Sequence, residues 1–284
     1  MLKQRIITAL VLLAILLPAL FYPAPEPFVG VVLVLIVAGG WEWGRMNGLG
    51  QPGAFALAGV CLLMCGLSWW AGWLVQPLPI LWVVAGMAWV LGGAALLRAG
   101  VPGWSAIPAA VRCVGGVLAL WLAWLAVGQA RFMGVNFLLS VLALVWAADI
   151  AAYFAGRAFG LKFTSRKLAA AISPGKSWEG VWGGMVAVVV MALVWQAIDA
   201  STGAAVPSFF SRMAGAGVWL VVVSAVFLAA MSVVGDLVES LIKRSVGVKD
   251  SSGLLPGHGG VLDRVDALLP TLPLAMMLVN LVPQ

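Results

Sequence analysis

The sequence predicts an all-α integral membrane protein with about nine transmembrane helices and a cytoplasmic N-terminus. Three observations lead to this fold class. The 284-residue chain is 63% hydrophobic, with a mean hydropathy of +1.10. Only 9% of its residues are charged, whereas soluble domains carry roughly 25%. Its apolar runs also reach the length of about 20 residues that a helix needs to cross a bilayer.

The spans are the apolar runs between charges, prolines and glycines. They are expected at residues 6–22, 28–44, 54–75, 79–97, 110–130, 134–156, 180–198, 215–238 and 264–282. The second is the weakest, because Gly39, Gly40 and Glu42 interrupt it. The first follows a basic start and could be a signal peptide, but its apolar run is long and Phe21-Tyr22-Pro23 is a poor cleavage site. We therefore expect it to remain as a span.

Basic residues predict the orientation of these spans. With the N-terminus inside, most Lys and Arg residues fall on inside segments, and only Arg131 and Arg212 fall in outside loops. Arg112 lies within a span. The positive-inside rule therefore places the N-terminus in the cytoplasm.

Composition disfavours a nucleic-acid partner and a metal site at the cysteines. A net charge of +6 could suggest a nucleic-acid partner, but the basic residues sit in short loops and not on one soluble face, so we expect no nucleic acid. The three cysteines, Cys61, Cys65 and Cys113, lie in apolar runs without a nearby His or carboxylate. We expect them to be buried thiols that act as small hydrophobic side chains.

Charge is concentrated in the second half of the chain. We interpret residues 1–130 as an N-terminal transmembrane scaffold of about five spans. Residues 131–284 are expected to form a catalytic transmembrane region with cytoplasmic polar segments at 149–180 and 236–266. An ion or lipid transporter that uses the intramembrane acids is the alternative from another class, but an inverted-repeat transporter should carry matching polar breaks in both halves.

The segment 149–180 begins with an acid that follows an apolar run. Asp149, Tyr153 and Gly156 are spaced i, i+4 and i+7, so they share one helix face. An acid beside an apolar run is energetically unfavourable unless it has a partner, so it is a functional candidate by default. It could also be an ordinary interface residue at a helix end.

A helix start is expected farther along this segment. Ser173 is a suitable N-cap and Pro174 suits the first helical position. The exposed N–H groups of such a start, beside Lys176, would suit a phosphate. A plain helix start with snorkelling lysines is the alternative.

The segment 236–266 holds the densest group of charges and the single histidine. Asp236, Glu239, Ser240 and Lys243 form one polar stripe on a helix, because they are spaced i, i+3, i+4 and i+7. Glycines then break the helix and allow close backbone approach to a ligand. Beyond them, Asp263 and Asp266 are expected to share a face of the final span.

Carboxylates without histidine or thiolate partners favour hard cations. Mg²⁺ takes one or two carboxylates together with phosphate oxygens and water. Basic residues are interleaved with these acids, so the expected ligand is a metal-bound polyphosphate; they are Lys243, Arg244, Lys249 and Arg264. A transition-metal site is not expected with one His, and His258 could equally be structural or catalytic. A solvated loop with internal salt bridges is the alternative for the whole stretch.

Three groups of residues carry a resemblance to a known family. The first is Ser240-Leu-Ile-Lys243-Arg244, then Lys249-Asp250, then Pro256-Gly-His258-Gly259-Gly260-Val-Leu-Asp263-Arg264-Val-Asp266. The others are Ser173-Pro174-x-Lys176-Ser177-x-Glu179-Gly180 and Asp149, Tyr153 and Gly156. Together they resemble the phosphatidate cytidylyltransferase (CDP-diacylglycerol synthase) family, although that family often has Thr at Ser177 and Lys at Gly175. The motifs cover the C-terminal half, and the N-terminal half is similar only in having many spans.

The resemblance implies an enzyme that converts CTP and phosphatidate into CDP-diacylglycerol and pyrophosphate in phospholipid biosynthesis. It implies a homodimer in the inner (cytoplasmic) membrane, in contact with membrane lipid, with its active site facing the cytoplasm. Asp236 and Asp263 would hold Mg²⁺, with room for a second cation. Asp266 would support them, and phosphates would contact Lys243, Arg244, Lys249 and Arg264. Substrate-binding candidates are Asp149, Tyr153, Ser173, Lys176, Glu179, Ser240, Asp250, His258, Gly259 and Gly260.

A different lipid phosphotransferase, one that moves an alcohol onto a CDP-lipid, is the alternative among enzymes. That class would need a cluster of acids on adjacent helices beginning with Asp-Gly. The sequence contains no Asp-Gly pair, so cytidylyl transfer is the preferred hypothesis.

Overall fold

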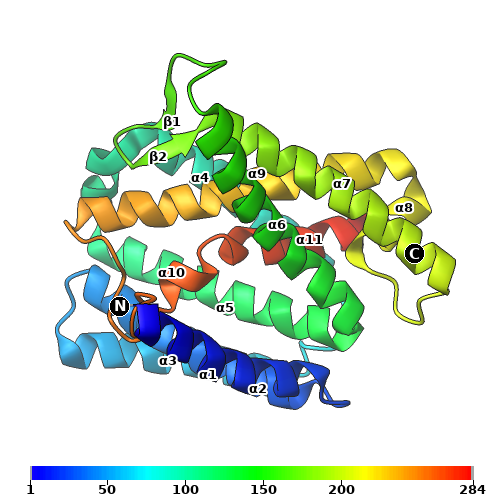
Figure 1. Cartoon of the computed structure of the whole chain (residues 1–284). Coiled ribbons are helices and arrows are strands. Elements are labelled where there is room, and N and C mark those ends of the chain that lie inside the picture. Colours follow the sequence, from blue (N-terminus) through cyan, green and yellow to red (C-terminus); the bar gives the residue numbers. More distant parts are fainter. Residues whose placement is uncertain (1, 283–284) are drawn as a thin grey trace.

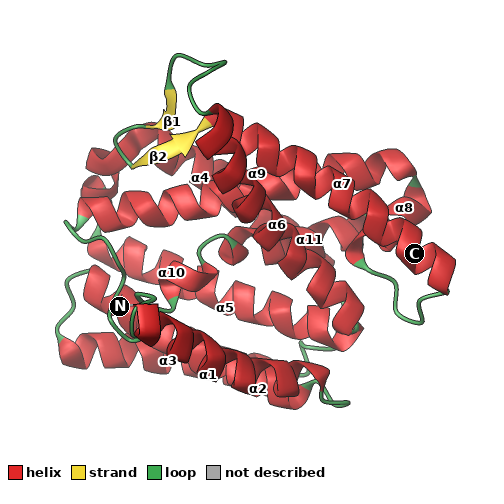
Figure 2. Ribbon diagram, viewed as in Figure 1, coloured by secondary structure: helices red, strands yellow, loops and turns green. Residues whose placement is uncertain are grey.

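Long helices make up most of the chain in the computed structural model, which describes residues 2–282 (Figures 1 and 2). Within these residues, eight helices are long and apolar enough to cross a membrane. They are α1 (Leu2–Phe21), α2 (Glu26–Met46), α3 (Gln51–Trp70), α4 (Pro79–Ala106), α5 (Ala109–Met133), α6 (Val135–Phe159), α7 (Trp178–Thr202) and α9 (Val218–Ser245). Each overlaps one expected span, so the all-α membrane fold class is confirmed.

The last expected span, residues 264–282, is divided into two shorter helices. They are α10 (Leu262–Val265) and α11 (Leu268–Leu281). The 14 residues of α11, at about 1.5 Å each, cover only about 21 Å, whereas the hydrocarbon core of a bilayer is about 30 Å thick. The helix contacts α4, α5 and α9 and lies in the middle of the molecule (Figure 1). It is therefore a core helix enclosed by the longer ones.

A small hairpin replaces the helix start expected at Ser173. Strands β1 (Lys167–Ala169) and β2 (Ser173–Ser177) pair antiparallel, with Lys167 opposite Ser177 (Figure 2). Helix α7 begins at Trp178, and its N-cap is Ser177, whose hydroxyl accepts a hydrogen bond from the Gly180 N–H at 3.2 Å. The prediction that Ser173 caps this helix is wrong, because strand pairing gives residues 173–177 an extended backbone.

Glycines on α7 bring it into direct contact with α6. A Cβ at Gly180 would lie 2.8 Å from the Ala152 carbonyl oxygen, and one at Gly184 would lie 2.8 Å from the Ala148 carbonyl oxygen. Only glycine permits such a close approach between backbones. This contact places the hairpin, which precedes α7, beside the C-terminal half of α6, which carries Asp149.

The long loop between α9 and α10, residues 246–261, reaches across the molecule to the first helix. The Thr8 hydroxyl donates to the Pro256 carbonyl oxygen at 2.9 Å. A Cβ at Gly257 would lie 2.8 Å from Arg5 Cγ. The beginning of α1 and this loop therefore lie on the same side of the bundle, as the predicted topology requires.

The remaining short helix, α8 (Phe209–Ala216), lies at the opposite end of α7 from the hairpin. Its buried side chains are Phe209, Phe210 and Met213. At this end, Asp199 of α7 accepts hydrogen bonds from the Ser208 N–H and the Ser211 hydroxyl. These contacts close the bundle away from the two polar segments.

Candidate active site

The two polar segments meet at Asp236 on α9. One oxygen of its carboxylate accepts a hydrogen bond from the Ser240 hydroxyl at 3.3 Å, one helical turn farther on. The other forms an ion pair with Lys176 of the hairpin. Asp236 lies nine residues before the end of α9, or about 14 Å along the helix axis. The site is therefore recessed below the helix end.

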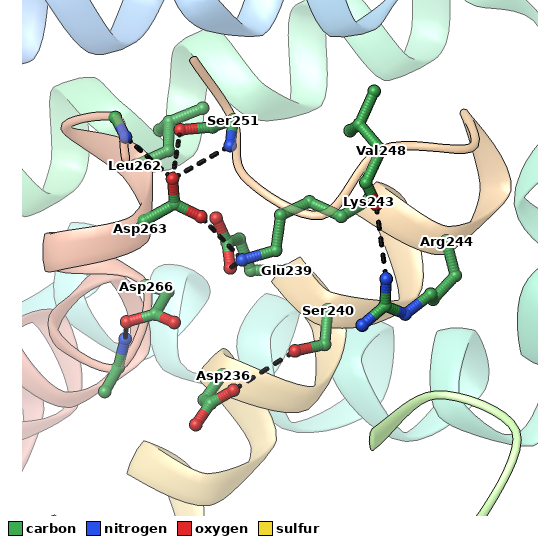
Figure 3. A network of polar contacts seen from close by, with 12 residues as sticks. Asp236, Glu239, Ser240, Lys243, Arg244, Val248, Ser251, Leu262, Asp263 and Asp266 are labelled. Atoms are coloured by element: carbon green, nitrogen blue, oxygen red, sulfur yellow. Dashed lines mark hydrogen bonds and ion pairs between the residues drawn. The ribbon is translucent and has the colours of Figure 1, made fainter. Parts of the chain in front are cut away.

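A second group of charges surrounds Asp263 on α10 (Figure 3). The Lys243 ammonium lies 2.6 Å from Asp263 Oδ1 and 2.5 Å from Glu239 Oε2. Asp263 Oδ2 accepts hydrogen bonds from the backbone N–H groups of Ser251 and Gly260, both at 2.8 Å. Burial favours the neutral acid, but the ammonium and these N–H groups outweigh it and hold the pKa of Asp263 below its usual range. Asp263 is therefore an ionised carboxylate with all its partners in place.

The two glycines before α10 are required by this arrangement. Gly259 has φ +81°, and a Cβ there would lie 2.6 Å from Asp263 Oδ2. A Cβ at Gly260 would lie 2.0 Å from Ser251 Oγ. The backbone can wrap around the carboxylate only without these side chains, which gives a structural reason for the Gly-Gly pair after His258.

Asp266 lies near enough to Asp236 to feel its negative charge. Gly235 lets α9 approach it closely, because a Cβ at Gly235 would lie 2.5 Å from the Asp266 carbonyl oxygen. The Asp266 carboxylate accepts a hydrogen bond from the Ala267 N–H at 2.7 Å. Burial, and then the negative charge of Asp236, raise the pKa of Asp266 to about 7. Excess negative charge therefore gathers between α9 and the start of α11.

Oxygen ligands and excess negative charge fit a hard cation. In the described part of the chain, no three His, Cys, Asp or Glu side chains converge to hold a metal ion by themselves. Mg²⁺ needs only one or two carboxylates when substrate oxygens and water complete its shell. Asp236 and Asp266 have the chemistry of such a pair, but in this conformation Asp236 is paired with Lys176 and Asp263 with Lys243.

Several other predicted residues are exposed near these two groups. Lys249, Asp250 and Arg264 are exposed on the loop and on α10. Arg244 is exposed too, and its guanidinium lies 3.4 Å from the carbonyl oxygens of Ile172 and Val248. These side chains are accessible to a ligand at the mouth of the site.

The remaining predicted residues have different surroundings. Tyr153 is exposed on α6, and its hydroxyl accepts a hydrogen bond from Arg157 at 3.4 Å. Glu179 is buried, and one oxygen accepts hydrogen bonds from the Thr164 N–H and hydroxyl, both at 2.8 Å. It thus orders the loop before the hairpin, and its role toward substrate stays a prediction.

The last three predicted residues are partly buried or exposed. Ser173 lies partly buried in β2, and Asp149 is exposed on α6. His258 belongs to a tight turn, in which its N–H donates to the Leu255 carbonyl oxygen at 2.8 Å. Its Nδ1 atom is buried and forms no hydrogen bond within residues 2–282.

Comparison with known proteins agrees with these motifs. A family model described as the cytidylyltransferase family matches residues 3–282. The chain belongs to the cytidylyltransferase family. A protein from Pseudomonas aeruginosa named phosphatidate cytidylyltransferase is 40% identical over 96% of this chain and 95% of its own length. One of the same name from Haemophilus influenzae is 37% identical over 96% of both chains. The resemblance is confirmed, and it extends through the N-terminal half.

Sequence reasoning missed two polar residues that this cytidylyltransferase-family chain places in the network, Ser251 and Glu42. Ser251 contacts Asp263 directly, whereas Glu239, which belongs to the predicted stripe, contacts Lys243. Glu42, on α2, accepts hydrogen bonds from Ser251 and from the start of α10. An acid within an apolar run is a signal of function, but in the sequence Glu42 registers only as an interruption of a weak span.

Proposed function

We propose that this protein transfers the cytidylyl group of CTP to phosphatidate, giving CDP-diacylglycerol and pyrophosphate in phospholipid biosynthesis. The observation that carries the proposal is the similarity over 96% of the chain to proteins named phosphatidate cytidylyltransferase. Support comes from the site, where residues from both motif segments meet at Asp236.

The chemistry suits the residues at the site. A phosphate oxygen of phosphatidate attacks the α-phosphorus of CTP, and the bond from that phosphorus to the pyrophosphate oxygen breaks. The attacking oxygen is already an anion, so no strong base is required. The main barrier is the repulsion between two polyanions. Basic side chains offset this repulsion, and correct positioning of the substrates lowers the barrier further. Lys176, Lys243, Arg244, Lys249 and Arg264 are the cations available for this task.

Mg²⁺ is the proposed cofactor. Asp236 would hold it with Asp263 or Asp266, together with substrate oxygens. When bound, the ion would neutralise phosphate charge and orient the reacting groups. Asp263 could reach the ion only by releasing Lys243, so Asp266 is the better placed partner in this conformation. In either case Asp236 must first give up its ion pair with Lys176.

We further propose that the reaction takes place at the cytoplasmic face of the inner membrane, in a homodimer. The orientation rests on the positive-inside rule. The acyl chains of phosphatidate would stay in the bilayer while its phosphate enters the recessed site. Proteolysis of the 246–261 loop in sealed inverted and right-side-out vesicles tests the orientation. Chemical crosslinking in the membrane tests the dimer.

One assay tests the proposed reaction. Purified protein is given phosphatidate and CTP labelled at the α-phosphate, with and without Mg²⁺, and dCTP and ATP are compared. We expect label in the lipid with CTP, and only when Mg²⁺ is present. Label that never enters lipid would contradict the proposal, and substrate flux in proteoliposomes without CTP would favour a transporter. Full activity of Asp263→Asn would overturn the site assignment.

A further inference from the structure

Glu42 is a buried acid on a helix that carries none of the motif residues. Its side chain is completely buried, with 0% exposure, one turn before the end of α2. One carboxylate oxygen accepts hydrogen bonds from the Ser252 hydroxyl and the Val261 N–H, and the other from the Ser251 hydroxyl and the Leu262 N–H. All four donors come from the loop after α9 and the start of α10, 209 to 220 residues away in sequence.

Glu42 needs these hydrogen bonds, because its side chain is buried and has no cationic partner in the part of the chain that the structure describes. In residues 2–282, no Lys, Arg or His forms an ion pair with Glu42. A buried carboxylate without a cation is strongly unfavourable unless several donors satisfy it. Hydrogen bonds from N–H and O–H groups to a charged oxygen are also stronger than neutral ones. The Glu42 side chain therefore favours the loop conformation that presents all four donors.

The same loop residues connect Glu42 to Asp263. The Ser251 hydroxyl lies 3.1 Å from Glu42 Oε2 and 2.9 Å from Asp263 Oδ2, so the two carboxylates share its single proton. A Cβ at Gly260 would lie 2.0 Å from Ser251 Oγ and 2.4 Å from Glu42 Oε1. Leu262, which donates its N–H to Glu42, immediately precedes Asp263. The position of Asp263 therefore depends on contacts that Glu42 makes.

We propose that Glu42 is a positioning residue for cytidylyl transfer. It holds residues 251–262 in place from α2, and it thereby sets where Asp263 and the Lys243 ammonium stand before substrate binds. This role rests on the proposed function. It also gives the N-terminal half of the chain a direct part in the active site.

Hydrogen exchange separates this role from general stabilisation. In Glu42→Gln, an amide NH₂ faces one of the two backbone N–H donors, so that hydrogen bond is lost. We expect backbone exchange in residues 251–263 of the protein without metal or substrate to become about 10-fold faster, as loss of one charged hydrogen bond predicts. Exchange in α4 and α5 should not change. Glu26→Gln is the matched control, because Glu26 is exposed at the other end of α2. Unchanged exchange in 251–263 would overturn the proposal.

Kinetics provide the second measurement. We expect Glu42→Gln to lower kcat/KM by about 10- to 100-fold, the range typical of residues that orient a ligand-binding group. Its effect should be smaller in a Ser251→Ala background, because Ser251 carries part of the connection to Asp263. Faster exchange in the loop with an unchanged kcat/KM would also overturn the positioning role.

A milder variant covers the case in which Glu42→Gln fails to fold. Ser252→Ala removes one donor to Glu42 and none to Asp263. We expect faster local exchange and a loss of activity of about 2- to 5-fold, with a fall in melting temperature smaller than that of Glu42→Gln. Normal loop exchange in Ser252→Ala, together with full activity, would contradict the proposal. A wild-type protein that does not use CTP and phosphatidate would overturn the proposed function, and the exchange experiment would still decide whether Glu42 orders the loop.

Discussion

The loop at residues 246–261 and the hairpin at residues 167–177 both border the candidate site, but they are held in different ways. The loop surrounds two buried carboxylates, Glu42 and Asp263, which together accept hydrogen bonds from Ser251, Gly260 and the start of α10. The hairpin reaches the site through the ion pair between Lys176 and Asp236 and a contact from Arg244 to Ile172.

The exposure of the two ion pairs shows what this difference means. The side chains of Lys243 and Asp263 are only 13% and 5% exposed, whereas those of Lys176 and Asp236 are 27% and 28% exposed. Removing one partner of a buried pair leaves an uncompensated charge, whereas a partly solvated pair contributes little to stability. The loop is therefore preorganised, and the hairpin can release Asp236 at little cost when a ligand arrives.

The largest effect is expected from breaking the buried pair. Asp263→Ala leaves two backbone N–H groups without their acceptor and leaves the Lys243 ammonium with Glu239 as its one remaining carboxylate partner among the described residues. We expect a loss of about 3–5 kcal/mol in stability, together with loss of detectable cytidylyl transfer. Thermal unfolding in detergent and the labelled-CTP assay measure the two effects. An unchanged melting temperature would show that the loop is not held through this carboxylate.

A matched pair of glycine substitutions compares the two regions directly. A Cβ at Gly260 would lie 2.0 Å from Ser251 Oγ, whereas a Cβ at Gly175 of the hairpin meets no atom within 4 Å. We expect Gly260→Ala to destabilise the protein by about 1–3 kcal/mol, as overpacking does, and to reduce activity. Gly175→Ala should stay within about 0.5 kcal/mol of wild type. Equal melting temperatures for the two variants would contradict the comparison.

The raised pKa of Asp266 predicts a stability that depends on pH. Because its pKa is about 7 in the folded protein, Asp266 keeps its proton between about pH 4 and 7, where the unfolded chain has lost it. Through this group the metal-free protein becomes less stable as the pH rises across that interval. We expect Asp266→Asn to raise the melting temperature by about 2–4 °C at pH 8 and to have little effect at pH 4.5.

Activity should move in the opposite direction, because Asn cannot supply the negative charge that would hold the proposed Mg²⁺. Melting curves in EDTA at both pH values, with activity measured at pH 8, test whether Asp266→Asn gains stability while it loses activity. A variant stabilised equally at both pH values would show that the charge of Asp266 is not the cause.

The smallest change in stability is expected for the hairpin. Lys176→Met removes the partner of Asp236, and we expect stability to change by less than about 1 kcal/mol. Without the competing ammonium, Asp236 should bind Mn²⁺, as a probe for Mg²⁺, more tightly in the absence of nucleotide. The KM for CTP should rise, because the proposed contact between Lys176 and a phosphate is lost. Mn²⁺ titration by electron paramagnetic resonance measures the first effect. Weaker Mn²⁺ binding would mean that Lys176 supports the cation site.

Sequence reasoning succeeded where the structure depends on one continuous segment. The eight long helices follow from apolar runs, because length and composition decide whether a segment can cross a bilayer. The stripe from Asp236 to Lys243 follows from helical spacing, and the structure keeps all four of its residues on α9. That these side chains form the active site stays a prediction, which the variants above test.

Sequence reasoning failed where segments distant in the sequence meet in the fold. Ser173 has the features of an N-cap, but pairing between residues 167–169 and 173–177 makes it part of a strand. The final apolar run is long enough to span, but its first residues form the separate helix α10 beside Glu42. Spacing along a single helix carries no information on the strand pairing of residues 173–177 or on the contact between α10 and Glu42.

The sequence by itself determined the membrane class, the long helices and the family, because hydropathy and linear motifs are properties of short segments. Only the tertiary structure decided which acids are surrounded by hydrogen-bond donors and which lie near other negative charges. Asp263 and Asp266 are three residues apart, yet the pKa of the first is lowered and that of the second is raised. The reason is physical: donors from Lys243, Ser251 and Gly260 converge on Asp263, whereas the fold places Asp266 near the negative charge of Asp236.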